Sequence, residues 1–271
     1  MAVDHAAAAP EVSVLRLVQR PQANQTGRSH GQTAMIAISS SLAGCEARLE
    51  RGRRGVPTLA IVGASFTAGV GPDNPVLSWA VLLAVRLRWN AVVYGVPGAG
   101  YANAGGGGRG PVDRMIGQER LRALHPAVVI VQAGLDDLGE PAAREMRRVR
   151  ATVSLIRAAA PGARIALITS FTGIWPRGGA ALHRLDRAIV TGARQADPRV
   201  IIMSPLSGRW RFARQNDGLH PSAAGDAWIA GTVRSILAAH GVRAAAVDAT
   251  VPEICDVSVG VTTPPATDRD A

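Results

Sequence analysis

The chain has 271 residues and a formal net charge of +10, and 47% of its residues are hydrophobic although only 4% are aromatic. This length suits one large domain, or one domain with tails, and the composition allows a core built mainly from Ala, Val, Leu and Ile. All 30 basic residues are arginine and are spread along the chain. That spread argues against a nucleic-acid partner and leaves a mildly anionic substrate or an anionic envelope surface to account for the charge.

Residues 1–56 are expected to form a low-order N-terminal tail with two interpretations. Leu42–Cys45 reads Leu-Ala-Gly-Cys and resembles a bacterial lipoprotein lipobox, with Arg20 and Arg28 as the preceding positive region. In that interpretation Cys45 is acylated and the protein is attached to a membrane at the cell envelope. A disordered tail rich in Ala, Ser and Gly explains the same residues equally well and leaves the protein in the cytoplasm.

The second cysteine, Cys255, falls in residues 243–271, which are expected to form a low-order C-terminal tail. With one cysteine in each tail, the sequence supports neither a core disulfide nor a metal site. The chain has no run of about 18 apolar residues, so no membrane-spanning helix is expected.

Residues 57–242 alternate between short β-rich runs and segments of helical periodicity. The β-rich runs are Thr58–Val62, Ala91–Tyr94, Ala127–Val131, Arg164–Thr169 and Val200–Met203. Because the apolar residues in these runs are continuous rather than alternating, they predict strands buried on both faces, as in a parallel sheet.

Four helices are predicted between and after these strands. The first begins with Asp73 or Asn74 as its cap and Pro75 at its first position. Its inward residues are expected to be Leu77, Val81, Leu82 and Val85. The other helices are indicated by Met146, Val149, Val153 and Ile156, by Leu182, Leu185 and Ile189, and by Ile229, Val233, Ile236 and Leu237. This order predicts a flavodoxin-like, three-layer α/β/α sandwich with a five-stranded parallel sheet, whose ligands bind beyond the carboxyl ends of the strands.

Ser65 follows the first predicted strand in the segment Gly63-Ala64-Ser65. A serine two residues past a buried strand lies on a turn at the mouth of the sheet, where backbone N–H groups can face an oxyanion. The spacing is not the G-x-S-x-G elbow, because position 67 is Thr, and it lacks the Gly-Lys of a phosphate-binding loop. Taken alone, a solvated turn serine explains this segment as well.

Asp217 and His220 lie three residues apart, just before the last predicted helix. This spacing lets a carboxylate hold one ring nitrogen of the histidine while the other nitrogen faces a nucleophile. The alternatives are that Asp217 only stabilises a turn and that His220 is an ordinary loop residue.

Four segments in chain order together resemble the SGNH (GDSL-like) serine hydrolases over about residues 57 to 242. They are Gly63-Ala64-Ser65, Gly95-Val96-Pro97-Gly98, Gly134-Leu135-Asp136-Asp137 and Asp217-Gly218-Leu219-His220-Pro221. The resemblance implies an esterase that works through an acyl-enzyme and needs no metal or organic cofactor. It implies that Ser65 is the nucleophile, His220 the base and Asp217 the group that orients the imidazole. It also places Gly98 and Asp136 at the oxyanion.

Two positions depart from the family pattern. Ala64 stands where the family usually has Asp, and Asp136 stands where the family has an Asn that donates to the oxyanion. An ionised Asp136 cannot donate, and losing one such donor typically costs about 100-fold to 1000-fold in rate. A protonated Asp136 could still donate, and repulsion from Asp137 would favour that protonated form.

The expected substrates are small-molecule or carbohydrate esters with short acyl groups, because the sequence has no long apolar lid segment. A transacylase would share every one of these residues. A catalytically weak binding protein on the same fold is a second alternative, for which Asp136 is the best argument. A nucleotide-binding domain is disfavoured, because Gly63-Ala64-Ser65 lacks the second glycine of G-x-G-x-x-G. Gly105–Gly108 is expected to form a mobile loop near the site.

Overall fold

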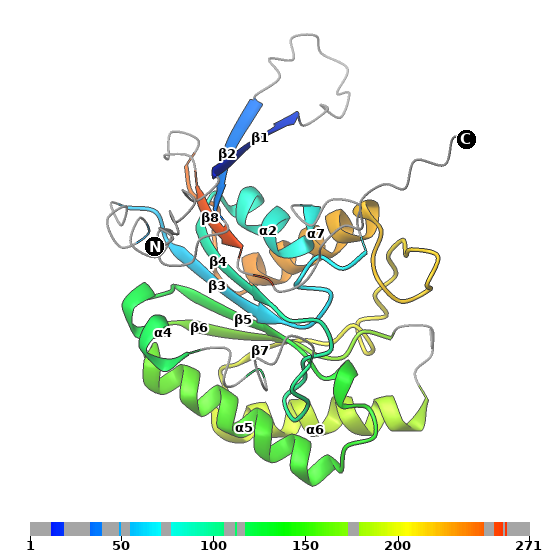
Figure 1. Cartoon of the computed structure of the whole chain (residues 1–271). Coiled ribbons are helices and arrows are strands. Elements are labelled where there is room, and N and C mark those ends of the chain that lie inside the picture. The colour runs from blue at the N-terminus through cyan, green and yellow to red at the C-terminus, as the bar shows by residue number, and fades with distance from the viewer. Residues whose placement is uncertain are drawn as a thin grey trace, which may run out of the picture.

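The computed structural model describes residues 12–18, 33–39, 49, 55–71, 77–105, 112, 117–172, 179–246, 252–256 and 258. Its centre is one eight-stranded sheet with the order β1-β2-β8-β4-β3-β5-β6-β7 (Figure 1). The strands are β1 (Val12–Val18), β2 (Thr33–Ser39), β3 (Thr58–Gly63), β4 (Asn90–Gly95), β5 (Val128–Gln132), β6 (Arg164–Ile168), β7 (Ile201–Met203) and β8 (Glu253–Asp256). Neighbouring strands in this order run parallel, except β1 and β2, which are antiparallel.

The five strands predicted from the sequence are β3 to β7. Their spatial order, β4-β3-β5-β6-β7, is that of the flavodoxin-like sheet, in which the chain changes direction between the first and third of these strands. The three-layer α/β/α sandwich is therefore confirmed, with more strands than the five expected.

Helices cover both faces of the sheet (Figure 1). They are α2 (Trp79–Leu87), α4 (Gln118–Leu124), α5 (Ala142–Ala159), α6 (Ala180–Ala196) and α7 (Ala223–Ala239). Side chains of β3 alternate between two apolar clusters. Ala60 and Val62 join residues of α5 and α6, whereas Leu59 and Ile61 join residues of α2 and α7. Because each face needs apolar side chains, the strands read as continuous apolar runs.

The helices α5, α6 and α7 contain the residues predicted for them, but α2 begins later than expected. It begins at Trp79, and the hydroxyl of Ser78 caps it by accepting a hydrogen bond from Val81 N at 3.4 Å. The predicted start at residues 73–75 lies outside the described residues. Of the residues predicted to point inward, Val81 is buried, whereas Leu77, Leu82 and Val85 are only partly buried. The face toward the core is instead formed by Trp79, Leu83 and Leu87. Within the part of the chain that the structure describes, no helix is long and apolar enough to cross a membrane.

The two segments expected to form low-order tails contain the strands β1, β2 and β8. The short strand β8 lies between β2 and β4, and both Ile254 and Cys255 are fully buried in it. Cys255 is disulfide-bonded, which corrects the expectation that the cysteines form no core disulfide. The four-residue strand escaped sequence analysis because its pairing partners are distant in the chain. Cys45, with the rest of Leu42–Cys45, Arg20 and Arg28, lies outside the described residues.

Candidate active site

Ser65 lies on a tight turn directly after β3, as the sequence predicts. Backbone hydrogen bonds from Thr67 N and Ala68 N to Ala64 O, at 3.0 and 2.9 Å, close this turn. A Cβ atom on Gly63 would lie 2.2 Å from the hydroxyl oxygen of Thr67, so only glycine fits there. The turn is tied to β5 because Ala64 N donates to the side-chain oxygen of Gln132 at 3.2 Å. Ser65 is thus held at the carboxyl edge of the sheet.

Asp217 and His220 meet Ser65 from the loop before α7. His220 Nε2 lies 2.9 Å from Ser65 Oγ, and His220 Nδ1 lies 2.6 Å from Asp217 Oδ2. The other carboxylate oxygen of Asp217 accepts the N–H groups of Leu219 and His220 at 2.8 and 3.0 Å. Asp217 therefore stabilises its own turn and also holds the imidazole, so the two interpretations of this residue are compatible.

The charge of Asp217 is maintained by these hydrogen bonds. Burial opposes its ionisation, but the hydrogen bonds from the His220 side chain and from the two backbone N–H groups outweigh burial and lower the pKa of Asp217. Its side chain is 47% exposed, whereas that of His220 is 16% exposed. A negative carboxylate beside Nδ1 favours the tautomer in which the proton lies on Nδ1 and Nε2 is free to accept one.

Gly98 follows β4 on a turn beside the Ser65 turn. Val96 N donates to Gly63 O at 2.9 Å, and a Cβ on Gly95 would lie 2.3 Å from the Cα of Ala68. This close approach brings the loop after β4 against the Ser65 turn. Gly98 has φ of 75°, a left-handed conformation that favours glycine. Of the predicted loop Gly105–Gly108, only Gly105 lies within the described residues.

Asp137 connects the Gly98 loop to the turn that carries Asp136. Both aspartates belong to the 3-10 turn η3 (Leu135–Asp137) after β5. The buried carboxylate of Asp137 accepts the backbone N–H groups of Tyr101, Ala102 and Asn103 at 2.6, 3.1 and 2.9 Å. The side-chain amide of Asn103 donates back to Asp136 O at 3.0 Å. The sequence analysis did not predict this clamp, because its donors lie more than 30 residues away and are backbone groups.

Asp136 is half-buried and lies within electrostatic reach of His220. Burial, followed by the charge of Asp137, raises the pKa of Asp136 from 3.8 to about 6, while the charge of His220 acts in the opposite direction. Asp136 is therefore neutral in mildly acidic solution and mostly ionised above neutral pH.

A second acid, Glu145 on α5, is fully buried beneath Asp137. Burial and the neighbouring Asp137 raise the pKa of Glu145 to about 9, so it is a neutral carboxylic acid at pH 7. The fully buried hydroxyl of Tyr101 belongs to the same cluster, because burial, Glu145 and Asp137 raise its pKa. The sequence analysis missed Glu145, because a glutamate in the first turn of a helix resembles an ordinary solvated residue.

All three phenylalanines of this aromatic-poor chain gather beside Ser65. Phe66 stacks on Phe171 with ring centroids 4.3 Å apart, and Phe212 packs edge-on against both. Phe66 also contacts the ring of His220, at 5.4 Å between centroids. The cluster gives the Ser65–His220 pair one apolar wall, which the scarcity of aromatics did not suggest.

Residues 61–228, more than half of the chain, match the GDSL-like Lipase/Acylhydrolase family. No curated protein matches the sequence. Among solved structures, the chain is similar to a family two carbohydrate esterase from Clostridium thermocellum in complex with cellohexaose, with 18% identity and a TM-score of 0.55. That similarity covers 68% of this chain and 64% of the esterase, so the chain spans just under two thirds of that protein.

Two further similar structures have different activities in their names. One is a carbohydrate acetylesterase from Sinorhizobium meliloti, with 14% identity, a TM-score of 0.54 and coverage of 68% of this chain and 99% of that one. The other is a salicylyl-acyltransferase from a tetracycline biosynthetic pathway, with 18% identity, a TM-score of 0.56 and coverage of 70% and 56%. At these identities the structures establish the SGNH fold, and the family match carries the assignment. The chain belongs to the GDSL-like lipase/acylhydrolase family.

Proposed function

We propose that the protein hydrolyses carboxylic esters through a covalent acyl-enzyme on Ser65. The observation that carries this proposal is the pair of hydrogen bonds that links Asp217, His220 and Ser65 in series. Such an arrangement activates a serine hydroxyl, which is a weak nucleophile without an adjacent base. The three residues come from opposite ends of the domain, and an ordinary turn serine has no need of this arrangement.

In the first half of the reaction, Ser65 Oγ attacks the ester carbonyl as His220 Nε2 takes its proton. Asp217 stabilises the imidazolium that forms. The tetrahedral intermediate collapses when His220 returns the proton to the leaving alkoxide, which departs as an alcohol. In the second half, His220 takes a proton from water as that water attacks the acyl-enzyme, and Ser65 regains its proton when the carboxylic acid leaves.

The oxyanion faces the backbone N–H groups of Ser65 and Gly98 and the side chain of Asp136. Below about pH 6 the protonated Asp136 donates to the oxyanion, in the role that the family gives to Asn. Above that pH its charge repels the oxyanion, although it also attracts the imidazolium of His220.

Short acyl esters, including acetyl esters of carbohydrates, are the substrates that we propose. The similar structures named as carbohydrate esterases support this class. The similar acyltransferase supports a second candidate, in which an alcohol rather than water attacks the acyl-enzyme. Analysis of the products with and without an added alcohol acceptor distinguishes the two, because only transfer forms a new ester.

The test of this function is hydrolysis of p-nitrophenyl acetate and butyrate from pH 5 to 9. We expect Ser65→Ala to lower kcat by about 10⁴-fold or more, because the nucleophile is removed. The control is Ser154→Ala, which changes an exposed serine on α5 and should leave kcat within twofold of wild type. Turnover that persists in Ser65→Ala would refute Ser65 as the nucleophile, and no turnover at all would favour a binding protein.

A further inference from the structure

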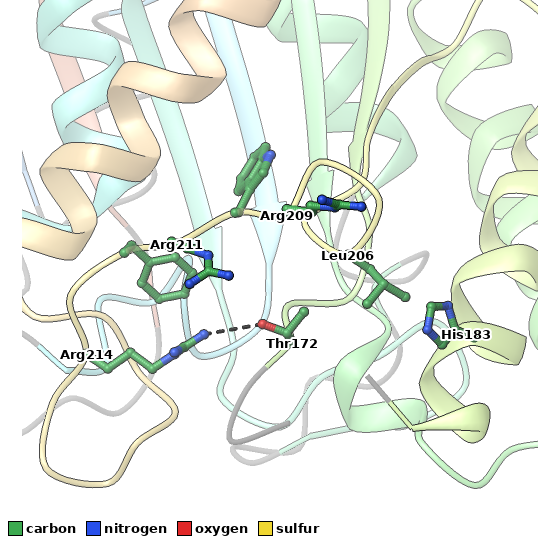
Figure 2. Close-up of a pocket in the computed structure, with 8 residues that line it drawn as sticks. Thr172, His183, Leu206, Arg209, Arg211 and Arg214 are labelled. Atoms are coloured by element: carbon green, nitrogen blue, oxygen red, sulfur yellow. Dashed lines mark hydrogen bonds between the residues drawn. The ribbon is translucent and has the colours of Figure 1, made fainter. Parts of the chain in front are cut away.

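A cavity of about 590 Å³ opens beside the candidate active site, at the carboxyl ends of β6 and β7 (Figure 2). Its lining residues are Thr172, His183, Leu206, Arg209, Trp210, Arg211, Phe212 and Arg214. Figure 2 shows the guanidinium of Arg214 directed toward Thr172, and His183 of α6 on the opposite side of the cavity. A volume of this size is within the range that holds small organic ligands.

The loop after β7 supplies the arginines in alternation with aromatic residues. Residues 209–214 read Arg-Trp-Arg-Phe-Ala-Arg. Trp210 and Phe212 are buried in the core, whereas Arg209 and Arg211 are exposed at the cavity. The aromatic residues therefore anchor the loop, and the arginines between them are presented to a ligand.

The cavity has an unbalanced positive charge. None of its lining residues is acidic, and no ion pair joins Arg209, Arg211 or Arg214 to a carboxylate among the described residues. Elsewhere, by contrast, Arg157 and Arg199 both pair with Asp197 at 2.6 and 3.1 Å. Those arginines stabilise the fold, whereas the arginines of the cavity are free to bind an anion.

Arg214 is held in place without a charged partner. One of its terminal nitrogens donates to the hydroxyl of Thr172 at 3.3 Å, and its guanidinium lies 4.8 Å from the centre of the Phe212 ring. Its Nε atom is buried and has no hydrogen-bond acceptor. A partly desolvated, preoriented guanidinium is costly unless an anion completes its hydrogen bonds, and its planar fork matches a carboxylate.

The cavity adjoins the catalytic residues through two sets of contacts. Arg214 pairs with Pro221 in an isolated β-bridge, and Gln215 N donates to His220 O at 2.9 Å. Phe212 of the cavity packs against Phe66, which follows the nucleophile in the chain. The cavity is therefore linked to the Ser65–His220 pair through the Phe212–Phe66–His220 ring contacts and through the backbone pairing of residues 214–215 with residues 220–221.

We propose that this cavity binds a carboxylate of the ester substrate, so that the preferred substrates are acidic esters such as O-acetylated hexuronates. The inference rests on the proposed esterase function and adds the chemical class of the substrate. The arginines bind the carboxylate, and the aromatic side chains between them provide apolar surface for the rest of the molecule.

The test compares acetate release from an O-acetylated methyl galacturonoside and from the corresponding O-acetylated methyl galactoside, which differ only in the carboxylate. For wild type we expect kcat/KM to be about tenfold or more higher for the galacturonoside in low salt. That preference should decrease as ionic strength rises, because salt screens the exposed guanidinium groups.

The variant Arg209→Gln/Arg211→Gln should lower this preference about tenfold to 100-fold, as expected when charge-assisted hydrogen bonds are lost. Both residues are exposed, so the fold should tolerate the change. The matched control is Arg147→Gln/Arg150→Gln, which removes the same charge from the exposed face of α5 and should leave the preference unchanged.

The outcomes separate the inference from the proposed function. Equal kcat/KM values for the two substrates, or an equal loss of preference in both double variants, would overturn the inference and leave the esterase function in place. Absence of Ser65-dependent turnover of any ester would instead refute the function itself. If the Arg209→Gln/Arg211→Gln protein fails to fold, the preference for the galacturonoside is measured in the single variant Arg211→Gln and in wild type at increasing salt. An unchanged preference in both measurements would overturn the inference.

Discussion

Two groups of carboxylates adjoin the Ser65–His220 pair, and the protein holds them in opposite ways. Asp217 lies on a half-exposed loop, where donors on both of its oxygens lower its pKa and keep it charged. Asp136 and Glu145 lie in or beneath η3, where burial raises their pKa values to about 6 and about 9. Asp217 supplies a negative charge to the histidine, whereas burial opposes ionisation in the second group, so that Glu145 is neutral at pH 7 and Asp136 is neutral below about pH 6.

The comparison shows that burial alone does not decide how readily a carboxylate ionises in this fold. The hydrogen-bond donors around the carboxylate also decide it. Asp137 is as deeply buried as Glu145, but it accepts three backbone N–H groups, and Glu145 accepts none from the backbone. Burial raises the pKa of Asp137 while these three donors oppose the rise, and repulsion from Asp137 raises the pKa values of Glu145 and Asp136.

The largest effect is expected when the charged side of this comparison is removed. Asp217→Asn should lower kcat by about 10³-fold to 10⁴-fold, because an amide no longer fixes the tautomer and no longer stabilises the imidazolium. Steady-state hydrolysis of p-nitrophenyl acetate measures the change. Asn216→Ala, in the same exposed loop, is the control and should remain near wild type. An Asp217→Asn enzyme within tenfold of wild type would mean that His220 needs no carboxylate.

Sequence analysis predicted those parts of the fold and site that depend on local pattern. The strands β3 to β7 are continuous apolar runs, and Ser65, Asp217 and His220 stand at their ends in recognisable segments. The strand β8 was not predicted, because its four residues become a strand only by pairing with distant β4 and β2.

The environment of the site was less predictable than its residues. The clamp at Asp137 uses backbone donors from another loop, and such donors leave no mark in the sequence. Arg209, Arg211 and Arg214 were indistinguishable from the many other arginines until their loop was seen around a cavity. Repulsion from the adjacent Asp137 was proposed from the sequence as a cause that raises the pKa of Asp136, but burial is the larger cause.

A smaller, pH-dependent effect is expected at Asp136. At pH 5 the wild-type carboxyl is protonated and donates as an amide would, so Asp136→Asn and wild type should have similar kcat. As pH rises through about 6, wild type loses the donor and gains a repulsive charge. The ratio of kcat for the Asn variant to kcat for wild type should therefore rise, to about tenfold to 100-fold at pH 8.

The ratio of the two kcat values is the useful quantity here, because pH effects that are common to both enzymes cancel in it. Asp136→Ala separates two effects, which are the loss of a hydrogen-bond donor to the oxyanion and the removal of a negative charge near it. Alanine has neither the charge nor a donor. The Asn variant should be faster than the Ala variant at every pH. A ratio that stays constant from pH 5 to 8 would show that Asp136 does not donate to the oxyanion.

The last prediction concerns stability rather than rate and tests the neutral side of the comparison. Burial raises the pKa of Glu145 from 4.5 to about 9, so its contribution to stability is present below about pH 4.5 and is lost as pH rises toward 9. Glu145→Gln cannot ionise in either state. The free energy of unfolding of this variant, relative to wild type, should therefore increase with pH between 5 and 8.5, by at most about 1.4 kcal/mol for each pH unit.

Asp226 on α7 provides an independent comparison for this measurement. It is fully buried, its pKa is raised to about 8 by burial, and it accepts a hydrogen bond from Trp79 N at 2.8 Å. Asp226→Asn keeps that acceptor and should show a trend of the same sign, and the two effects should add because the residues lie on opposite faces of the sheet. Urea unfolding at several pH values measures both. The contrary result is that the free energy of unfolding of Glu145→Gln has the same pH dependence as that of wild type while that of Asp226→Asn does not. That result would mean that Glu145 is ionised in the folded protein and that the active-site cluster holds more than one negative charge.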